Sequence, residues 1–260
     1  MKQSQHSRNR LSTAFDKGLA PWWTSIQGDN PHYCVSAQQA AAEGYGYFVR
    51  ETEGGLEWQE LTAHQPVTRL LPDLNYQHYR TQRARHERVA RACGCTRVDG
   101  LEVCDATAGL GRDGLILAAC GARVTLVERN PLMVLLLSRL LSRLDSQVTL
   151  VAADSCQWLA QRRYDVVYLD PMFPARSKSA AIRKEMALLQ QLEVPADSTE
   201  TESLLGAAME ASRYRTVVKR PLKAESVGSA PVSGSISGKT VRFDFYSKRS
   251  LSEISPPGAA

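Results

Sequence analysis

Two short segments of the sequence combine residue types that can bind a charged ligand and carry out a reaction on it. The first, DATAGLGRDG, runs from Asp105 to Gly114 and combines three glycines with acidic side chains. The second, DPMF, runs from Asp170 to Phe173 and places a carboxylate, a proline carbonyl and an aromatic ring next to one another. We therefore treat the first segment as a candidate cofactor loop and the second as a candidate reaction loop.

The glycines of the cofactor loop satisfy the pattern G-x-G-x-x-G, with Gly109 and Gly111 as its first two members. Glycines there let the backbone approach a ligand at a helix N-terminus. The pattern fits both a nicotinamide or flavin dinucleotide and S-adenosylmethionine. Asp105 and Asp113 favour the second ligand, because carboxylates repel a pyrophosphate and attract an ammonium and a sulfonium. We therefore predict S-adenosylmethionine as the cofactor.

The ends of two further predicted strands supply more cofactor contacts. Glu128 ends the second strand, where its carboxylate can accept hydrogen bonds from the ribose hydroxyls, and Arg129 beside it can pack against the adenosine. Asp154 and Ser155 end the third strand, where we expect the adenine amino group to be recognised. Asp154 is also suited to cap the helix that follows, and the two roles are compatible.

The reaction loop suits methylation of an exocyclic amino group on a nucleobase. Such a nitrogen is a poor nucleophile because its lone pair is delocalised into the ring. The Asp170 carboxylate and the Pro171 carbonyl can hold its protons and direct the lone pair at the methyl carbon, while Phe173 stacks on the base. A base within a helix must be flipped out to reach such a site. DPMF differs at one position from the (Asp/Asn)-Pro-Pro-(Tyr/Phe) signature of amino methyltransferases.

Strand and helix patterns alternate regularly after Gly100 and position both loops. The apolar runs LEVCDA, RVTLVE, QVTLVAAD and YDVVYLD are separated by helical runs. This alternation predicts an α/β fold with a doubly wound, mostly parallel sheet, in which ligands bind at the carboxyl ends of the strands. We expect this Rossmann-like domain over residues 75–254, a small α/β or β-rich domain over residues 1–74, and a disordered tail over residues 255–260.

Composition limits the function classes. No apolar run approaches the ~20 residues of a membrane span, and the N-terminal MKQSQHSRNR has no apolar signal segment. The 6 cysteines are scattered and lack metal-site spacing, so we expect no metal, reduced thiols and a cytoplasmic protein. The net charge of +5 weakly favours an anionic partner.

Basic residues flank the reaction loop and the last predicted parallel strand. Lysine and arginine contacts to phosphates position an RNA without specifying its sequence. We predict such contacts from Arg176, Lys178, Arg183, Lys184, Lys219 and Arg220. For the Lys219–Arg220 pair, a strand end with solvated charges is an alternative. Five more arginines crowd the predicted connecting helix over residues 75–92, where a solvated helix face explains them equally well.

The chain resembles the RsmJ family, the bacterial 16S ribosomal RNA guanine-N2 methyltransferases of the small subunit. The resemblance covers residues 98–247 and rests on DATAGLGRD, VERNP, YLDPMFP with the following K-S-A and K-E-M, VVKRP and GKTVRFDFY. It implies S-adenosylmethionine as methyl donor, N2 of a guanine as acceptor, and 16S ribosomal RNA or the small subunit as partner. The cofactor contacts that it implies are Arg112, Asp113, Glu128, Arg129, Asp154, Ser155 and Asp170.

The chain departs from the family pattern in two places. It has Asp154-Ser155 where the family tends to have Ser-Ser, and its N-terminal third matches poorly. Three other functions remain open. An amino methyltransferase of adenine or another base in RNA or DNA would use the same site, and a nicotinamide-dependent oxidoreductase would use the glycine pattern. A catalytically idle RNA-binding protein on the same fold would not need the complete DPMF loop.

Overall fold

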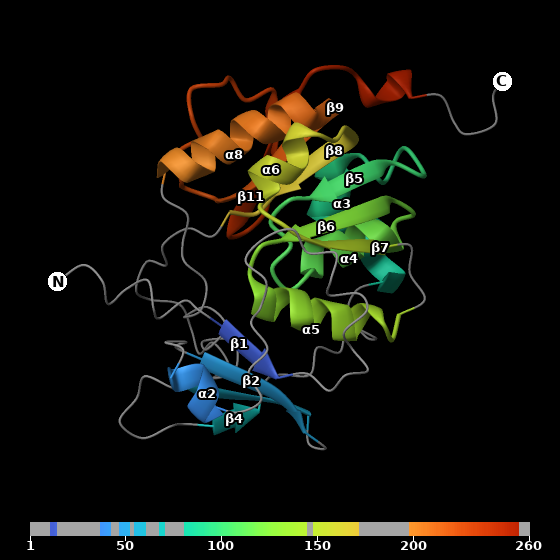
Figure 1. Cartoon of the computed structure of the whole chain (residues 1–260). Helices are drawn as coiled ribbons and strands as arrows, with labels where there is room; N and C mark the ends of the chain where they lie inside the picture. The colour runs from blue at the N-terminus through green and yellow to red at the C-terminus, as the bar shows by residue number, and fades with distance from the viewer. Residues whose placement is uncertain are drawn as a thin grey trace. The chain divides into compact units, whose positions relative to one another are not determined.

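The computed structural model of this chain describes eight segments, which divide into two compact units (Figure 1). The first unit holds the described residues up to Leu70, and the second holds those from Thr81 onwards. The described segments are residues 11–14, 37–42, 47–52, 55–60, 68–70, 81–144, 148–171 and 198–254.

The first unit contains a four-stranded sheet with the strand order β1-β2-β3-β4. β1 pairs with β2 in parallel, and β2, β3 and β4 pair antiparallel. Thr52 lies opposite Gly55, so β2 and β3 form a hairpin. The bounds are β1 Leu11–Ala14, helix α2 Ala37–Ala42, β2 Tyr47–Thr52, β3 Gly55–Glu60 and β4 Thr68–Leu70.

The second unit is built on a seven-stranded sheet with the order β10-β11-β9-β8-β5-β6-β7. The five strands from β9 to β7 are parallel, whereas β11 pairs antiparallel with both β9 and β10. The predicted doubly wound, mostly parallel sheet is confirmed. The bounds are β5 Glu102–Asp105, β6 Arg123–Glu128, β7 Val148–Ala152, β8 Tyr164–Leu169, β9 Ser212–Pro221, β10 Gly234–Ser237 and β11 Val241–Ser247.

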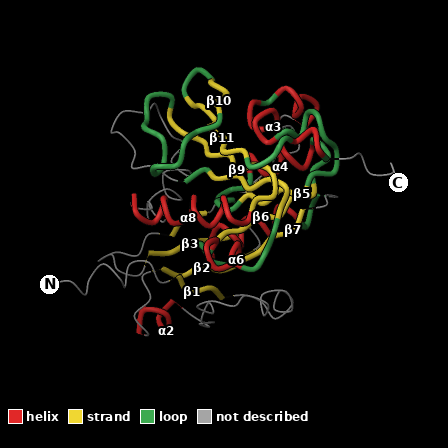
Figure 2. Tube along the Cα trace, turned by 90° about the horizontal axis from the view of Figure 1, so that it is seen from above, coloured by secondary structure: helices red, strands yellow, loops and turns green. Residues whose placement is uncertain are grey.

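Helices cover both faces of this sheet. Figure 2 shows α3 and α4 on one side of the strands and α6 and α8 on the other. The bounds are α3 Arg88–Cys93, α4 Arg112–Ala119, α5 Pro131–Leu141, α6 Ser155–Ala160 and α8 Ser198–Ala211, with short 3₁₀ helices at Thr81–His86 and Leu251–Glu253. Among the described helices, none has the length and apolar character needed to cross a membrane.

Burial on both faces explains why the central strands read as continuous apolar runs. Neighbouring residues of a strand point to opposite faces, and in β8 both Val166 and Val167 are fully buried. On the α6 and α8 face, Leu159 and Leu205 pack with Val167 in one apolar cluster. Two covered faces leave the strand ends as the part of the sheet where polar side chains gather.

The parallel register brings chemically active residues to one edge of the sheet. Asp105 at the end of β5 lies opposite Tyr168 of β8, and Leu169 lies opposite Val218 of β9. Asp170 and Lys219, which follow these last two residues, therefore reach the same carboxyl edge. The fold assembles the candidate site from segments that are distant in sequence.

Gly111 is required where β5 turns into α4, and we predict that its replacement destabilises the protein. It has φ +72°, and a Cβ there would lie 2.6 Å from Leu137 Cδ2. Gly111→Ala should lower the free energy of unfolding by about 1–3 kcal/mol. The matched control is Gly206→Ala in the exposed interior of α8, where an added Cβ meets nothing within 4 Å. That change should raise stability by about 0.5–1 kcal/mol.

Urea denaturation of both variants measures the two free energies. An unchanged free energy of unfolding in Gly111→Ala would contradict the close packing described at this turn.

Candidate active site

The cofactor loop joins β5 to α4 through two left-handed glycines. Gly109 has φ 51° and Gly111 has φ 72°, conformations that L side chains rarely adopt. The turn is closed by the Gly111 N–H, which donates to the Ala108 carbonyl at 2.6 Å. Arg112 begins α4 directly afterwards and is exposed. The loop therefore presents backbone and the first turn of α4 at the carboxyl edge.

Glu128 is fixed against the cofactor loop by backbone hydrogen bonds. Its Oε2 accepts from the Gly109 N–H at 2.7 Å, and its Oε1 accepts from the Asn130 N–H at 2.7 Å. Burial raises the pKa of this carboxyl, and the backbone donors offset part of that rise. Each carboxylate oxygen keeps a further lone pair, so Glu128 can still accept from a ribose hydroxyl.

Asp105 is a buried acid beneath the loop, with 2% of its surface exposed. Its Oδ1 accepts from the Thr107 N–H at 3.2 Å, and a Cβ added at Gly114 would lie 3.1 Å from its Oδ2. Burial, together with the neighbouring Asp113 charge, raises the pKa of Asp105 to about 8. Near neutral pH this carboxyl is therefore mostly protonated unless a cation approaches it.

Lys219 links the two loops. Its Nζ lies 2.8 Å from Asp113 Oδ2 on the cofactor side and 2.7 Å from Asp170 Oδ2 on the reaction side. Tyr168 Oη also donates to Asp113 Oδ2, at 2.6 Å. The Lys219 side chain is 25% exposed, and its ammonium contacts both acids. Its charge serves an internal contact, whereas the sequence predicted a contact with RNA phosphate.

The three-way contact keeps opposite charges in place at the carboxyl edge. Burial lowers the pKa of Lys219, but the carboxylates of Asp170 and Asp113 outweigh it and hold this pKa well above its usual range. Burial raises the pKa of Asp170, and Lys219 offsets part of that rise. The pKa of Tyr168 is also raised, mainly by burial, so its phenol remains a hydrogen-bond donor.

A second contact joins the reaction loop to the cofactor loop. The Asp170 N–H donates to Thr107 Oγ1 at 2.5 Å, and Pro171 is buried beside it. Asp170 is therefore fixed through its backbone and through its side chain. Five of the predicted site residues lie outside the described residues: Phe173, Arg176, Lys178, Arg183 and Lys184.

The predicted adenine-side residues make contacts within the protein. Asp154 Oδ1 accepts from the Gln157 N–H at 3.0 Å, which confirms its role as the cap of α6. Ser155 Oγ donates to the Ala106 carbonyl at 2.5 Å and so ties α6 to the end of β5. Arg129 forms an ion pair with Glu200 of α8. Arg129, Asp154 and Ser155 lie at the carboxyl edge, because they follow the adjacent parallel strands β6 and β7.

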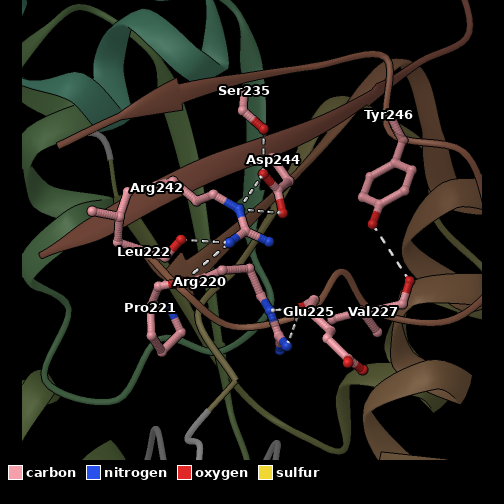
Figure 3. Close-up of polar contacts among 9 residues, drawn as sticks. All are labelled: Arg220, Pro221, Leu222, Glu225, Val227, Ser235, Arg242, Asp244 and Tyr246. Atoms are coloured by element: carbon pink, nitrogen blue, oxygen red, sulfur yellow. Dashed lines mark hydrogen bonds and ion pairs between the residues drawn. The ribbon is translucent and has the colours of Figure 1, made fainter.

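Arg220 faces the interior of the second unit. It is 8% exposed, and its Nε donates to the Glu225 carbonyl at 2.9 Å (Figure 3). Its neighbour in sequence, Lys219, points to the other face of β9, towards Asp170. The adjacent cations of the sequence thus have different surroundings, because successive strand residues alternate between faces.

Sequence reasoning missed the internal role of Lys219 and the contributions of Thr107 and Tyr168. The signal for Lys219 was present: in the predicted sheet, a lysine and an aspartate end neighbouring strands. Opposite charges at adjacent strand ends are close enough to pair. Nothing in the local pattern marked the threonine hydroxyl or the tyrosine phenol, since both depend on the register between strands.

The charge balance of the edge fits S-adenosylmethionine. Asp113 and Asp170 contact the Lys219 ammonium, and two further acids, Asp105 and Glu128, end the neighbouring strands β5 and β6. Such a site suits a ligand that carries an ammonium and a sulfonium, and it would repel a pyrophosphate. The two left-handed glycines, Gly109 and Gly111, leave two positions of the loop without a side chain.

Comparison with known proteins agrees with this chemistry. A family model described as "Putative SAM-dependent methyltransferase" matches residues 41–248. Ribosomal RNA small subunit methyltransferase J of Alkalilimnicola ehrlichii is 38% identical over 218 residues, which are 76% of this chain and 81% of that protein. The Chromobacterium violaceum protein of the same name is 39% identical over 222 residues, 79% of this chain and 85% of that protein. This chain belongs to the RsmJ family.

Membership of the RsmJ family confirms the predicted cofactor, S-adenosylmethionine, and removes the nicotinamide-dependent alternative. The match to the Marinobacter nauticus RsmJ protein is 42% identical but spans only 63% of each chain. A solved structure of a SAM-dependent methyltransferase from Neisseria gonorrhoeae, NGO1261, has the same fold, with a TM-score of 0.60 and 24% identity. The aligned region covers 96% of this chain and 97% of the Neisseria gonorrhoeae chain.

The raised pKa of Asp105 predicts a pH-dependent stability that Asp105→Asn removes. Between about pH 4 and pH 8 the folded protein keeps a proton on Asp105 that the unfolded chain has released. Stability therefore falls as pH rises through this interval. The variant, which has no such proton, should become progressively more stable than the wild type from pH 5 to pH 9.

Urea denaturation of both proteins at pH 5, 7 and 9 measures the difference. A difference that is constant with pH would mean that Asp105 ionises as in the unfolded chain. In parallel, calorimetric titration with S-adenosylmethionine should show weaker binding by Asp105→Asn, because the variant cannot present a carboxylate to the ammonium.

Proposed function

We propose that this RsmJ protein transfers the methyl group of S-adenosylmethionine to the exocyclic N2 of a guanine in 16S ribosomal RNA. The observation that carries the proposal is the position of Asp170. It ends β8 at the carboxyl edge, and it is held through Thr107 and Lys219 to the loop that receives the cofactor. The relatives named ribosomal RNA small subunit methyltransferase J support the choice of RNA.

The cofactor side is formed by residues at the ends of three strands, β5, β6 and β7, and in the segments that follow them. When bound, S-adenosylmethionine supplies an electrophilic methyl group on a sulfonium. Asp105 and Asp113 place negative charge beneath its cationic groups, while Gly109 and Gly111 let the backbone approach it. Glu128 accepts hydrogen bonds from the ribose. The roles proposed for the remaining contacts are packing against the adenosine and recognition of its base, by Arg112, Arg129, Asp154 and Ser155.

The base side is formed by the reaction loop. Lys219 occupies Oδ2 of Asp170, which leaves Oδ1 to accept a hydrogen bond from the guanine amino group. The Pro171 carbonyl accepts the second one, and Phe173 stacks on the ring. Held in this way, the nitrogen lone pair forms the new N–C bond as the S–C bond breaks. The Asp170 carboxylate then takes the proton that the methylated nitrogen loses.

The basic residues divide into two groups in this proposal. Arg176, Lys178, Arg183 and Lys184 follow the reaction loop in sequence and contact RNA phosphates. Lys219 instead positions Asp170, and Arg220 fastens the loop that follows β9. The partner is therefore 16S ribosomal RNA, either free or within the small subunit.

Product analysis tests the proposed acceptor atom. The protein is incubated with S-adenosylmethionine carrying a labelled methyl group and with 16S ribosomal RNA from cells that lack this protein. The RNA is then digested to nucleosides and separated. We expect the label in N2-methylguanosine. Label in N6-methyladenosine or a methylated cytidine would assign the site to another base. The assay is repeated with small subunits from the same cells, and a digest that stays unlabelled with both substrates would refute the proposal.

The variant Asp170→Ala, measured in the same assay, tests the role of the Asp170 carboxylate. The variant should lose all detectable transfer, because the amino group loses its acceptor and Lys219 loses a partner. It should still unfold cooperatively and show a thermal shift with adenosylhomocysteine. Full activity of this variant would refute the mechanism while leaving the product assignment intact.

Lys219→Met tests the positioning role of the ammonium. Because Lys219 lowers the pKa of Asp170, its loss should raise that pKa and move the acid limb of the kcat profile to higher pH. At neutral pH we expect kcat to fall by about 10²-fold, the cost of misplacing a reacting group by about 1 Å. Lys219→Arg should keep the acid limb in place. A uniform loss at every pH would indicate a purely structural role.

A further inference from the structure

We propose that the end of β9 and the turn between β10 and β11 form a docking surface for the phosphate backbone of the RNA substrate. The surface consists of Leu222, Lys223, Lys239 and Thr240, and we call it the hairpin edge. The inference rests on the proposed function, since it assigns a contact of the same substrate. It involves residues other than those already proposed to contact phosphates.

The hairpin edge lies at the same end of the sheet as the reaction loop. Val241 of β11 lies opposite Pro221 of β9, and the Leu222 N–H donates to the Thr240 carbonyl at 3.0 Å. Lys223 is four residues from Lys219, whose ammonium contacts Asp170. Four residues span at most about 14 Å. The hairpin edge is therefore within reach of RNA that flanks a base held at Asp170.

A buried ion pair holds one side of the hairpin edge. Asp244 is 1% exposed and binds the Nε of Arg242 through both carboxylate oxygens, at 2.9 and 3.1 Å. The same guanidinium donates through Nη1 to the carbonyls of Leu222 at 2.9 Å and Pro221 at 3.3 Å (Figure 3). Arg242 therefore fastens the backbone that follows β9 to β11.

The loop that follows β9 is fastened at two further points. Arg220 donates to the Glu225 carbonyl, and Tyr246 Oη donates to the Val227 carbonyl at 3.4 Å (Figure 3). The turn on the opposite side is closed by the Gly238 N–H, which donates to the Val241 carbonyl at 2.7 Å. A surface that is already ordered pays less conformational entropy when it binds.

The exposed side chains of the hairpin edge suit a polyanion. Lys223 and Lys239 are exposed, and Leu222 is 38% exposed beside them. Of the 5 basic residues from Lys219 to Arg242, three make the internal contacts described above, and the other two, Lys223 and Lys239, are the exposed cations of the hairpin edge. Arg88, which begins α3 and is exposed, adds a further cation: a Cβ on Gly238 would lie 3.4 Å from its Cδ.

Charge reversal at the hairpin edge tests the inference. The double variant Lys223→Glu with Lys239→Glu is compared with a matched pair, Lys248→Glu with Arg249→Glu, at the exposed opposite end of β11. Binding of purified 16S ribosomal RNA is measured between 50 and 200 mM salt. The hairpin-edge variant should bind about 10-fold more weakly, and its log–log salt slope should be shallower by about 1–2, because two phosphate contacts are lost.

The control pair should retain most of the wild-type affinity and slope. Both variants should keep the wild-type thermal shift with adenosylhomocysteine, since none of these four side chains contacts the cofactor loop. Equal weakening by the two pairs, or an unchanged salt slope at the hairpin edge, would overturn the inference.

Product analysis separates this failure from that of the proposed function. If the wild type forms N2-methylguanosine but the hairpin-edge variant binds RNA normally, only the docking surface is wrong. If the wild type neither binds nor methylates the RNA, both are wrong.

Discussion

The contact of one buried lysine with two acids organises the candidate site. Lys219 comes from β9, Asp113 from the first turn of α4, and Asp170 from the end of β8. The three side chains are partly buried, Asp170 least of them, and partial removal of a charge from water is offset when that charge has a partner in good geometry. The alignment of β8 with β9 and the turn of the cofactor loop therefore have to be correct together. The contacts of Lys219 with Asp113 and Asp170 therefore connect the cofactor loop to the reaction loop.

Positively charged side chains near the carboxyl edge are of two kinds, those with contacts inside the protein and those that are exposed. Lys219 and Arg220 are neighbours in sequence, yet one points to the acids of the site and the other to the loop after β9. Lys223 nearby is exposed, and no ion pair joins it to another residue in the part of the chain that the structure describes. Buried cations here shape the site, while exposed ones remain available for a polyanionic substrate.

Much of the fold and the cofactor side was predictable from the sequence because it depends on local pattern. A few neighbouring residues are enough to recognise the apolar strand runs, the glycines of the cofactor loop and the acids at strand ends. The direction of a cation such as Lys219 does not, because it depends on which strand lies beside β9 and in what register. Thr107 escaped prediction for the same reason: its partner is 63 residues away.

The position of β11 between β9 and β10 has a consequence for how the protein acquires its site during synthesis. Among the described strands β10 pairs with β11, so the hairpin edge forms only after β11, which ends at Ser247, has been synthesised. The bridge from Asp113 to Lys219 likewise closes a separation of 106 residues. Contacts so distant in sequence form late, because loop closure must precede them. The Asp113 contact beside the cofactor loop and the ordered hairpin edge therefore both depend on β9 and β11, which follow β5 to β8 in the sequence.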